Sequence, residues 1–322
     1  MRWIFLCHNC NPMKSKASAP PPAAVRALLR HFRAQRPLRG GSLLVTLFGD
    51  GIAPRGGAVT LGSLIRLAAP FGLTERLVRT SVARLARDGW LASRRFGRRS
   101  EYHLTASGAE RFAQATRRIY GANPRAWRGV WTLVLLPAGA PRQLQTRREL
   151  HWLGFGQLTP ALFAHPACTP GQARAWLRNL YGAGAALLLR SASSDVRVDR
   201  RLAARGWDLR QQARRYRRFI ARFAPVAAAI PAHGATAETA FVVRTLLIHE
   251  YRKIHLLDPL LPPALLPRNW AGTAAYELCR RLYARVFADA ESHLSACARR
   301  LHRPLPRADA AARARFGGVA AR

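Results

Sequence analysis

The chain has 322 residues, which is enough for two or three domains, and its 49% hydrophobic content excludes a disordered basic tail. Its 53 basic residues outnumber the 16 acidic ones, and the formal net charge of +37 predicts attraction to a polyanion. Apart from Lys14, Lys16 and Lys253 the basic residues are arginines, a skew that genomic base composition can also produce. The positions of the arginines therefore carry more information than their number.

The cysteines and the N-terminal region indicate a cytoplasmic protein. The cysteines are odd in number and irregular in spacing, which disfavours a disulfide framework: Cys7, Cys10, Cys168, Cys279 and Cys297. The lone C-x-x-C at residues 7–10 has no second pair, so no metal site is predicted. The apolar run at residues 3–7 is too short for a signal sequence, and no run of about 20 apolar residues exists for a membrane helix. Residues 1–40 are predicted to be a poorly ordered extension, with a basic helix possible at 25–35.

A helix with an apolar face and an arginine-rich face is predicted from Glu75 onward. Thr74 can cap its N-terminus, Glu75 suits the positive end of the helix dipole, and Gly89 suits its C-terminal end. Helical spacing places on the apolar face Leu77, Val78, Val82, Leu85 and Ala86. The opposite face carries Arg76, Arg79, Thr80, Ala83, Arg84 and Arg87.

This arginine face allows two interpretations. It is either an ordinary solvated helix face or a surface that contacts nucleic acid. Acidic residues are nearly absent from it, so ion pairs at i, i+4 spacing are not expected to offset the arginines. The small side chain of Ala83 in the middle of the face also permits close approach to a partner. Both features favour nucleic-acid contact.

A hairpin with a basic tip is predicted directly after this helix. Two short strands are expected, with Trp90, Leu91 and Ser93 in the first and Tyr102 and Leu104 in the second. Gly97 lies between them and can adopt a left-handed turn conformation. The tip arginines repel one another unless an anion lies among them: Arg94, Arg95, Arg98 and Arg99. The alternative is a basic loop without a partner, but the adjoining helix favours nucleic-acid contact.

The segment before the arginine helix completes a DNA-binding unit. Helices are predicted at 42–48 and 63–69, a strand that can pair with the hairpin at 59–61, and a tight turn at 70–72. The order helix, strand, helix, turn, helix and hairpin is that of a winged helix-turn-helix. We therefore predict a winged-helix DNA-binding domain over residues 41–120, with the arginine helix in the major groove.

Two further domains are predicted downstream. Residues 126–200 show a β-α-β-β-α-β order typical of a ferredoxin-like domain, with strands at 130–136, within 155–163 and at 185–190, and helices at 142–153 and 170–180. Residues 206–319 are predicted to be a mainly helical ligand or dimerisation domain, with helices at 210–223, 238–256 and 274–298 and a proline-rich loop at 258–267. The chain is thus predicted to be a multidomain α+β protein.

Several local motifs recur in a known family. In the first half they are Phe48-Gly49-Asp50, Arg55-Gly56-Gly57, Leu61-Gly62-Ser63-Leu64, Glu75-Arg76-Leu77-Val78-Arg79-Thr80, Asp88-Gly89-Trp90 and Gly97-Arg98-Arg99-Ser100. In the second half they are Leu247-Ile248-His249-Glu250-Tyr251-Arg252, Asp258-Pro259-Leu260-Leu261-Pro262, Leu266-Pro267, Asn269-Trp270-Ala271-Gly272 and Arg315-Phe316-Gly317-Gly318. On these motifs the chain resembles the PaaX family of bacterial transcriptional repressors, from about Ser42 to Val319.

The resemblance implies a homodimeric repressor of phenylacetate catabolic genes that binds double-stranded operator DNA and is released by phenylacetyl-coenzyme A (phenylacetyl-CoA). The central domain of the family resembles the small ferredoxin-like nucleases of CRISPR systems, which need an aspartate at the end of the first strand. Here that place is occupied by Leu135-Leu136-Pro137-Ala138. We therefore expect a structural or dimerisation module and no enzyme, catalytic residue, metal or cofactor.

Two sets of site residues are predicted. For DNA, we expect base reading by Arg76, Arg79, Thr80 and Arg84, with further contacts from Arg87 and the hairpin arginines Arg94, Arg95, Arg98 and Arg99. An acyl-CoA needs arginines for its phosphates and an apolar slot for its aromatic ring. Candidates near the proline-rich loop are His249, Tyr251, Arg252 and Trp270. The alternative is that His249 and Tyr251 are core residues bonded to the backbone of the loop.

The expected mechanism is a change of dimer geometry. Two winged helices read two half-sites, and the ligand favours a geometry whose spacing no longer matches them. Two rival classes are an enzyme, such as a nuclease or acyl-CoA hydrolase, and a non-specific nucleic-acid-binding protein. A regulator of the same fold that answers to another aryl-acyl-CoA is a closer alternative.

Overall fold

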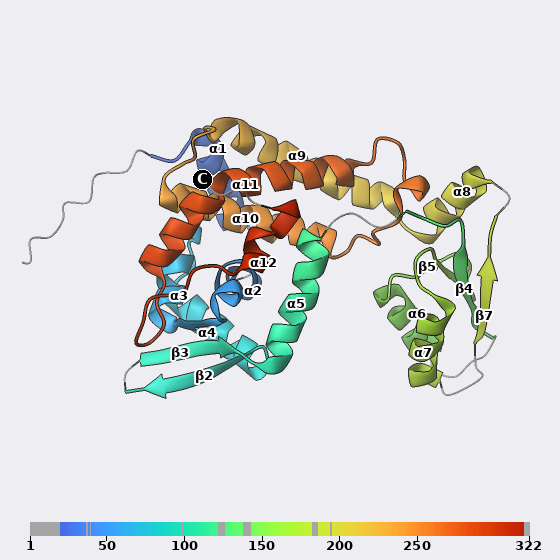
Figure 1. Cartoon of the computed structure of the whole chain (residues 1–322), viewed down its shortest axis with the longest axis horizontal. Coiled ribbons are helices and arrows are strands. Elements are labelled where there is room, and N and C mark those ends of the chain that lie inside the picture. The colour runs from blue at the N-terminus through green and yellow to red at the C-terminus, as the bar shows by residue number, and fades with distance from the viewer. Residues whose placement is uncertain are drawn as a thin grey trace, which may run out of the picture.

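The computed structural model describes residues 20–36, 38, 40–97, 99–121, 126–137, 143–181, 186–193 and 195–318. Figure 1 shows a larger part that contains both the N-terminal and the C-terminal segments, and a smaller part built around a separate sheet. The chain is a mixed α+β protein with a three-stranded and a four-stranded sheet. Cys7, Cys10 and Arg98, which the sequence analysis considered, lie outside the described residues.

The second half of the predicted extension contains a helix, close to the basic helix expected at residues 25–35. Helix α1 (Ala23–Arg33) buries Val25, Leu28 and Phe32 against the main core. Its apolar residues recur at helical spacing, so the helix can be held by packing although its exposed face is basic.

The segment from residue 40 to residue 121 has the predicted order of elements. It comprises α2 (Gly40–Thr46), a π-helical turn η1 (Leu47–Ile52), β1 (Ala58–Thr60), α3 (Leu61–Ala68), α4 (Glu75–Arg87), β2 (Leu91–Phe96), β3 (Arg99–Leu104) and α5 (Ala106–Tyr120). The sheet is antiparallel in the order β1-β3-β2, with Val59 opposite Tyr102 and Ser93 opposite Tyr102 on the other side. The strand predicted at 59–61 therefore pairs with the hairpin.

The smaller part contains the predicted alternation of strands and helices. Its elements are β4 (Trp131–Leu135), α6 (Gln143–Trp152), β5 (Gly156–Gln157), β6 (Leu162–His165), α7 (Pro170–Tyr181) and β7 (Leu187–Ser191), followed by the unpredicted α8 (Val196–Gly206). The strands are antiparallel in the order β5-β6-β4-β7. Val134 and Phe163 pack with residues of α6 and α7 on one face of the sheet. Trp131 and Ala164 pack with α8 and the proline-rich loop on the other.

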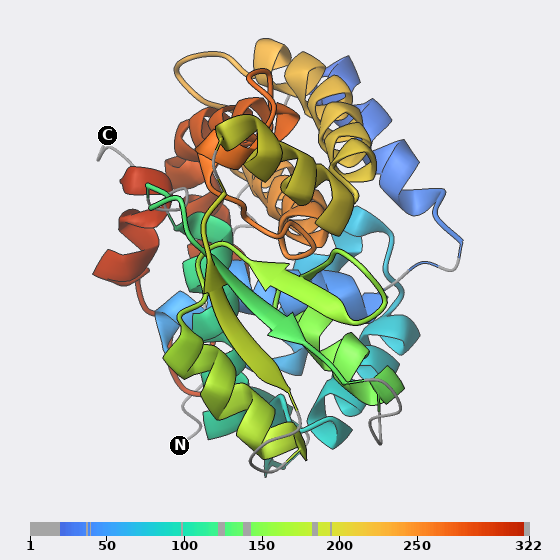
Figure 2. The same cartoon turned by 90° about the vertical axis from the view of Figure 1, so that its right-hand side faces the viewer.

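The C-terminal part is helical, as predicted. It comprises α9 (Leu209–Ala229), α10 (Ala237–His255), α11 (Ala271–Cys297) and α12 (Ala310–Arg313). One hydrophobic core joins residues 25–120 with residues 213–316. The predicted 41–120 and 206–319 units thus share their core, and the smaller part is inserted between them (Figures 1 and 2).

Candidate nucleic-acid interface

Helix α4 exposes its predicted arginine face. Thr74 caps the helix by accepting a hydrogen bond from a first-turn N–H, and Gly89 follows it with a left-handed φ of 73°. Val78, Val82 and Leu85 are buried. The opposite face lies in solvent and carries Arg76, Arg79, Thr80, Ala83, Arg84 and Arg87. The Thr80 hydroxyl donates a hydrogen bond to the backbone of its own helix, so its oxygen can still accept one from an N–H group of a DNA base.

Two acidic residues pair with this face, contrary to the sequence-based expectation. Arg79 Nη2 lies 2.6 Å from Glu75 Oε1, and Arg84 Nε lies 3.9 Å from Asp88 Oδ2. The expectation was wrong because it considered the arginine stripe and overlooked the residues one turn before and after it. The four side chains are 49% to 79% exposed, so water screens the pairs and each contributes at most about 1 kcal/mol. A phosphate can therefore compete for either arginine.

The hairpin of β2 and β3 adds a second basic surface beside α4 (Figure 1). Gly97 forms its tip with a left-handed φ of 57°, as predicted. Arg94, Arg95 and Arg99 are exposed. The structure thus places three of the four predicted tip arginines in solvent, near the exposed face of α4.

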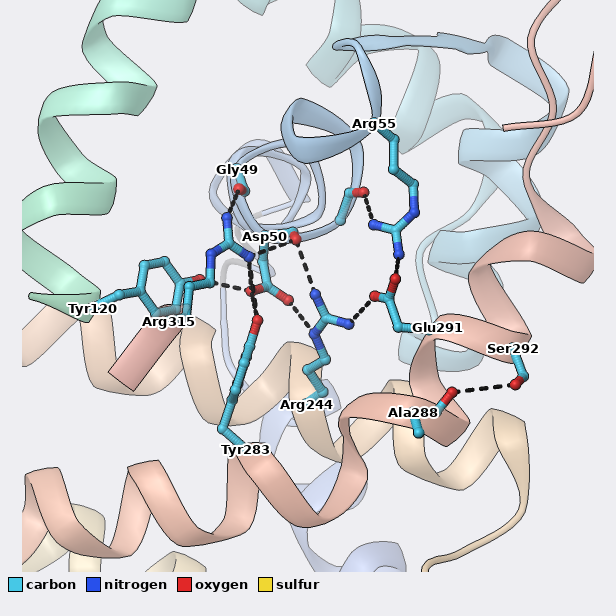
Figure 3. Close-up of polar contacts among 11 residues, drawn as sticks. Gly49, Asp50, Arg55, Tyr120, Arg244, Tyr283, Ala288, Glu291, Ser292 and Arg315 are labelled. Carbon is cyan, nitrogen blue, oxygen red and sulfur yellow. Dashed lines mark hydrogen bonds and ion pairs between the residues drawn. The ribbon is translucent and has the colours of Figure 1, made fainter. Parts of the chain in front are cut away.

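A buried charge cluster joins this unit to the C-terminal helices, and we call it the Asp50 junction. Its elements are η1, the 3-10 turn η2 (Ala53–Arg55), α5, α10, α11 and the 3-10 turn η5 (Arg315–Gly317), and its side chains are those of Asp50, Arg55, Tyr120, Arg244, Tyr283, Glu291 and Arg315 (Figure 3). Asp50 Oδ2 accepts a hydrogen bond from Arg244 Nε over 2.7 Å, and Oδ1 accepts one from Arg315 Nη1 over 2.9 Å. The Tyr120 and Tyr283 hydroxyls donate to the same Oδ1 over 2.7 and 2.9 Å. One carboxylate is therefore bound by four side chains from four other elements.

The electrostatics of the Asp50 junction keep its carboxylate ionised. Burial alone would raise the pKa of Asp50, but Arg244 and Arg315 outweigh burial and hold that pKa below its ordinary value. Glu291 pairs with both Arg244 and Arg55, so Arg244 has two counter-charges, Asp50 and Glu291. The Arg315 guanidinium also lies 4.3 Å from the centre of the Tyr120 ring. The Asp50 junction thus connects the N-terminal unit to the C-terminal helices, and its charged groups are not free to bind a ligand.

Two of the predicted ligand residues hold α10 against α2. His249 is buried, and its Nδ1 lies 3.0 Å from Thr46 Oγ1. Arg252 donates from Nε to Thr46 Oγ1 over 2.8 Å and from Nη2 to the Ser42 carbonyl and hydroxyl oxygens over 2.7 and 2.8 Å. Burial, followed by the charges of Arg252 and Lys253, holds the pKa of His249 well below 6.5. His249 is therefore neutral at pH 7 and packed in an interface.

The other two ligand candidates lie near the proline-rich loop, in different settings. Tyr251 is fully buried, and its hydroxyl lies 3.1 Å from His255 Nδ1. Trp270 is half-buried and lines a hollow of about 140 Å³ with Asp258 and the loop. A Cβ at Gly272 would lie 2.4 Å from Trp270 Nε1, so the indole rests on a position where only glycine fits. Of the four candidates, Trp270 is the one that faces this hollow.

Comparison with known proteins identifies the family. Residues 39–108 match the description PaaX-like protein, and residues 207–296 match the PaaX-like protein C-terminal domain. The transcriptional repressor PaaX of Escherichia coli (strain K12) is 37% identical over 303 residues, which cover 90% of this chain and 94% of that protein. This chain belongs to the PaaX family of transcriptional repressors. Among solved structures, the uncharacterised protein Rv0674 of Mycobacterium tuberculosis matches with a TM-score of 0.46 and 22% identity, over 70% of this chain and 89% of that one.

Several PaaX motifs prove to be parts of the Asp50 junction. The first supplies Asp50, the second supplies Arg55 and the last supplies Arg315. Sequence reasoning did not foresee that these distant motifs meet, and it missed Arg244 altogether. The sequence did contain a sign that Arg244 is special, because this arginine interrupts an apolar run within a helix, Phe241-Val242-Val243-Arg244-Thr245-Leu246-Leu247. A lone charge in such a run needs a buried partner.

Proposed function

We propose that this PaaX family member is a cytoplasmic repressor of phenylacetate catabolic genes that binds operator DNA through an N-terminal winged helix. The observation that carries the proposal is the exposed arginine face of α4 beside the basic tip of the β2–β3 hairpin. In this arrangement α4 enters the major groove and the hairpin acts as the wing. Arginine suits both tasks, because its planar guanidinium group can form two hydrogen bonds at once to a guanine base or to a phosphate. Such a protein is a regulator and not an enzyme.

We assign the smaller part as a ferredoxin-like module that supports a homodimer. Its β5-β6-β4-β7 order and β-α-β-β-α-β sequence are those of a ferredoxin-like sheet. Figure 2 shows the strands of this sheet with no helix in front of much of their outer face. On the edge strand β7, Leu187 is 62% and Leu189 is 47% exposed. A second copy of the chain would cover these leucines, and two winged helices would then reach two operator half-sites.

We further propose that phenylacetyl-CoA releases the repressor and that its aromatic ring occupies the hollow beside Trp270. The hollow of about 140 Å³ is close to the roughly 150 Å³ of a cavity that binds one benzene molecule. Leu261 and Pro263 line it, and Arg268 is exposed at its rim for a phosphate. The ligand must bind the released state more tightly than the DNA-bound state in order to cause release.

A mobility-shift competition tests this function. The full chain is titrated onto promoter DNA from its own gene neighbourhood and onto random DNA, with and without phenylacetyl-CoA, another aryl-acyl-CoA or free phenylacetate. The proposal expects promoter preference and release by phenylacetyl-CoA alone. Equal affinity for both DNAs would show a non-specific binder, and release by a different thioester would reassign the effector.

A single variant tests the place of the effector. Trp270→Leu should weaken release at least tenfold in ligand concentration while operator affinity stays within about twofold. Arg252→Ala is less suitable, because it removes hydrogen bonds that hold α10 against α2. Trp152→Leu is the matched control, since Trp152 is 83% exposed on α6. If the ligand released the Trp270 and Trp152 variants equally well, its aromatic ring would not bind in this hollow.

A further inference from the structure

The turn that follows α11, residues 298–305, lies against the hairpin and the start of α3 (Figure 1). The Arg299 carbonyl oxygen accepts a hydrogen bond from the Thr60 N–H over 3.0 Å, and the Arg299 N–H donates to Ser63 Oγ over 3.0 Å. The Leu301 N–H donates to Glu101 Oε1 on β3 over 2.8 Å. The backbone of the turn is therefore fixed to the DNA-binding unit by three hydrogen bonds.

An aromatic contact and a hydrogen bond within the turn strengthen this attachment. His302 packs edge-on against Phe96 near the hairpin tip, with ring centres 5.7 Å apart. Within the turn, the Arg300 N–H donates to the Arg303 carbonyl oxygen over 3.0 Å. Because the backbone and the imidazole hold the turn, its arginines can bind a partner at little cost in ordering.

A strongly basic groove of about 660 Å³ lies between this turn, α3, α4 and β3. Its arginines come from all four segments: Arg66, Arg79, Arg99, Arg299 and Arg300. In the described part of the chain, Arg66, Arg99 and Arg299 have no acidic partner within 4.0 Å. Arg300 lies 3.9 Å from Glu101, a carboxylate already engaged by the backbone of the turn. The groove is therefore suited to an anion with several charges along its length.

We infer that the turn after α11 is a third DNA-contacting element, in which Arg299 and Arg300 bind the phosphodiester backbone. The inference rests on the proposed function. If α4 occupies the major groove and the hairpin the neighbouring minor groove, the phosphate strand that separates the two grooves passes between them. Arg79 of α4 and Arg99 of β3 border the basic groove at that place. Gly62 allows close approach, because a Cβ there would meet only Arg66 Nη1, at 3.8 Å.

This assignment makes the C-terminal helices part of the DNA-binding surface. The turn continues directly from α11, which begins after Trp270 at the proposed effector hollow. A helix of 27 residues is about 40 Å long, so one rigid element links the hollow to the phosphate contacts. Ligand binding at one end of α11 can therefore alter DNA contact at the other.

The test is the salt dependence of DNA binding by the full chain. The double variant Arg299→Ala/Arg300→Ala is compared with Arg214→Ala/Arg217→Ala, a pair of exposed arginines on α9 that carries the same charge change. Each lost phosphate contact should reduce the slope of log K against log salt by about 0.9, hence about 1.8 for the double variant. Affinity for operator and random DNA should fall by the same factor, roughly tenfold or more at low salt.

The outcomes separate the possible explanations. A slope equal to that of the α9 control overturns the inference, and so does a loss confined to operator DNA, which would indicate base reading. The variant Arg299→Gln/Arg300→Gln keeps polar side chains but removes both charges, so it should lose the same slope, and it covers the case in which the alanine variant fails to fold. Coenzyme A alone is titrated in parallel, and loss of its binding with an unchanged DNA slope would assign the groove to the effector. If the wild type shows no preference for operator DNA, the proposed function fails. The salt dependence of binding to random DNA still tests whether the turn contacts DNA.

Discussion

The arginines of α4 and the arginines of the Asp50 junction carry the same charge in opposite settings. Arg76 and Arg84 are exposed, and Arg84 has only a loose partner 3.9 Å away. Arg244 and Arg315 are 1% and 5% exposed, and they bind the Asp50 carboxylate directly. In the junction the guanidinium groups are buried and paired with carboxylates of the protein, whereas on α4 they are available to another molecule.

The difference shows that arginine content alone says little about DNA binding. Leaving one member of a buried ion pair without its partner is strongly destabilising, whereas an exposed pair contributes little. Substitutions in the junction should therefore change folding first, and substitutions on α4 should change DNA binding with folding intact. The following predictions test that separation in order of decreasing effect.

Asp50→Asn should produce the largest effect. It removes the charge shared by Arg244 and Arg315 and should lower the free energy of unfolding by about 3–5 kcal/mol. Asp88→Asn is the control, because Asp88 is 49% exposed and lies 3.9 Å from its arginine. Urea unfolding followed by circular dichroism measures both. Similar losses in the two variants would contradict the distinction between junction and surface.

The pH dependence of stability should also follow burial. The folded pKa of His249 lies well below 6.5, so below pH 6.5 the unfolded chain binds a proton that the folded chain does not. The stability that His249 contributes is thus complete above pH 6.5 and is lost as pH falls toward its folded pKa. His249→Gln should flatten the fall in unfolding free energy between about pH 7.5 and 5.5, measured in urea.

Other histidines shape the same curve, so a matched control is needed. Burial also lowers the pKa of His165, to about 4, and of His293. The His249 variant should therefore flatten the curve only in part. His165→Gln is the reference, because burial lowers the pKa of His165 in the same direction, and it should flatten the curve by a comparable amount. An unchanged slope in the His249 variant would show that its protonation does not oppose folding.

Arg76→Ala/Arg84→Ala should change operator recognition with little effect on stability. If these side chains read bases, each loss should cost about 1–3 kcal/mol of discrimination between operator and random DNA. Arg94→Ala/Arg95→Ala makes the same charge change in the hairpin and should lower the affinity for operator and random DNA equally. Binding isotherms on the two DNAs decide between these roles. A uniform loss in the α4 variant would make its arginines backbone contacts.

The contrast also explains what could be predicted from the sequence. Local patterns gave the limits of α4 within one residue, because the Thr74 cap and Gly89 act through neighbouring backbone atoms. The exposed arginine stripe followed from helical spacing alone. The pairing of β1 with β3 followed from the order of short elements.

Long-range pairing was harder to foresee, because it depends on how segments distant in the chain pack together. Asp50 and Arg315 are 265 residues apart, and no spacing rule connects them. His249 was placed correctly in a buried setting by one interpretation, but its partner is Thr46 of α2 and not the proline-rich loop. The shared core of the first and last parts was missed for the same reason, since each part has apolar faces that could have formed a core of its own.

Glu75→Gln should have the smallest effect, and it should have opposite signs for folding and for binding. Loss of the i, i+4 pair with Arg79 and of a negative charge at the N-terminus of α4 should reduce the free energy of unfolding by about 0.5 kcal/mol. The same change frees Arg79 and removes a carboxylate that repels phosphate, so DNA affinity should rise a few fold.

Glu110→Gln on α5 has the same charge change and corrects for the long-range effect of net charge. An affinity that rises equally in both variants would mean that Arg79 gains no phosphate contact when Glu75 is removed. A rise confined to Glu75→Gln, with a steeper salt slope, would place Arg79 at the DNA backbone and not at a base. This would move Arg79 from the group of base-reading residues to the basic groove that it shares with Arg299.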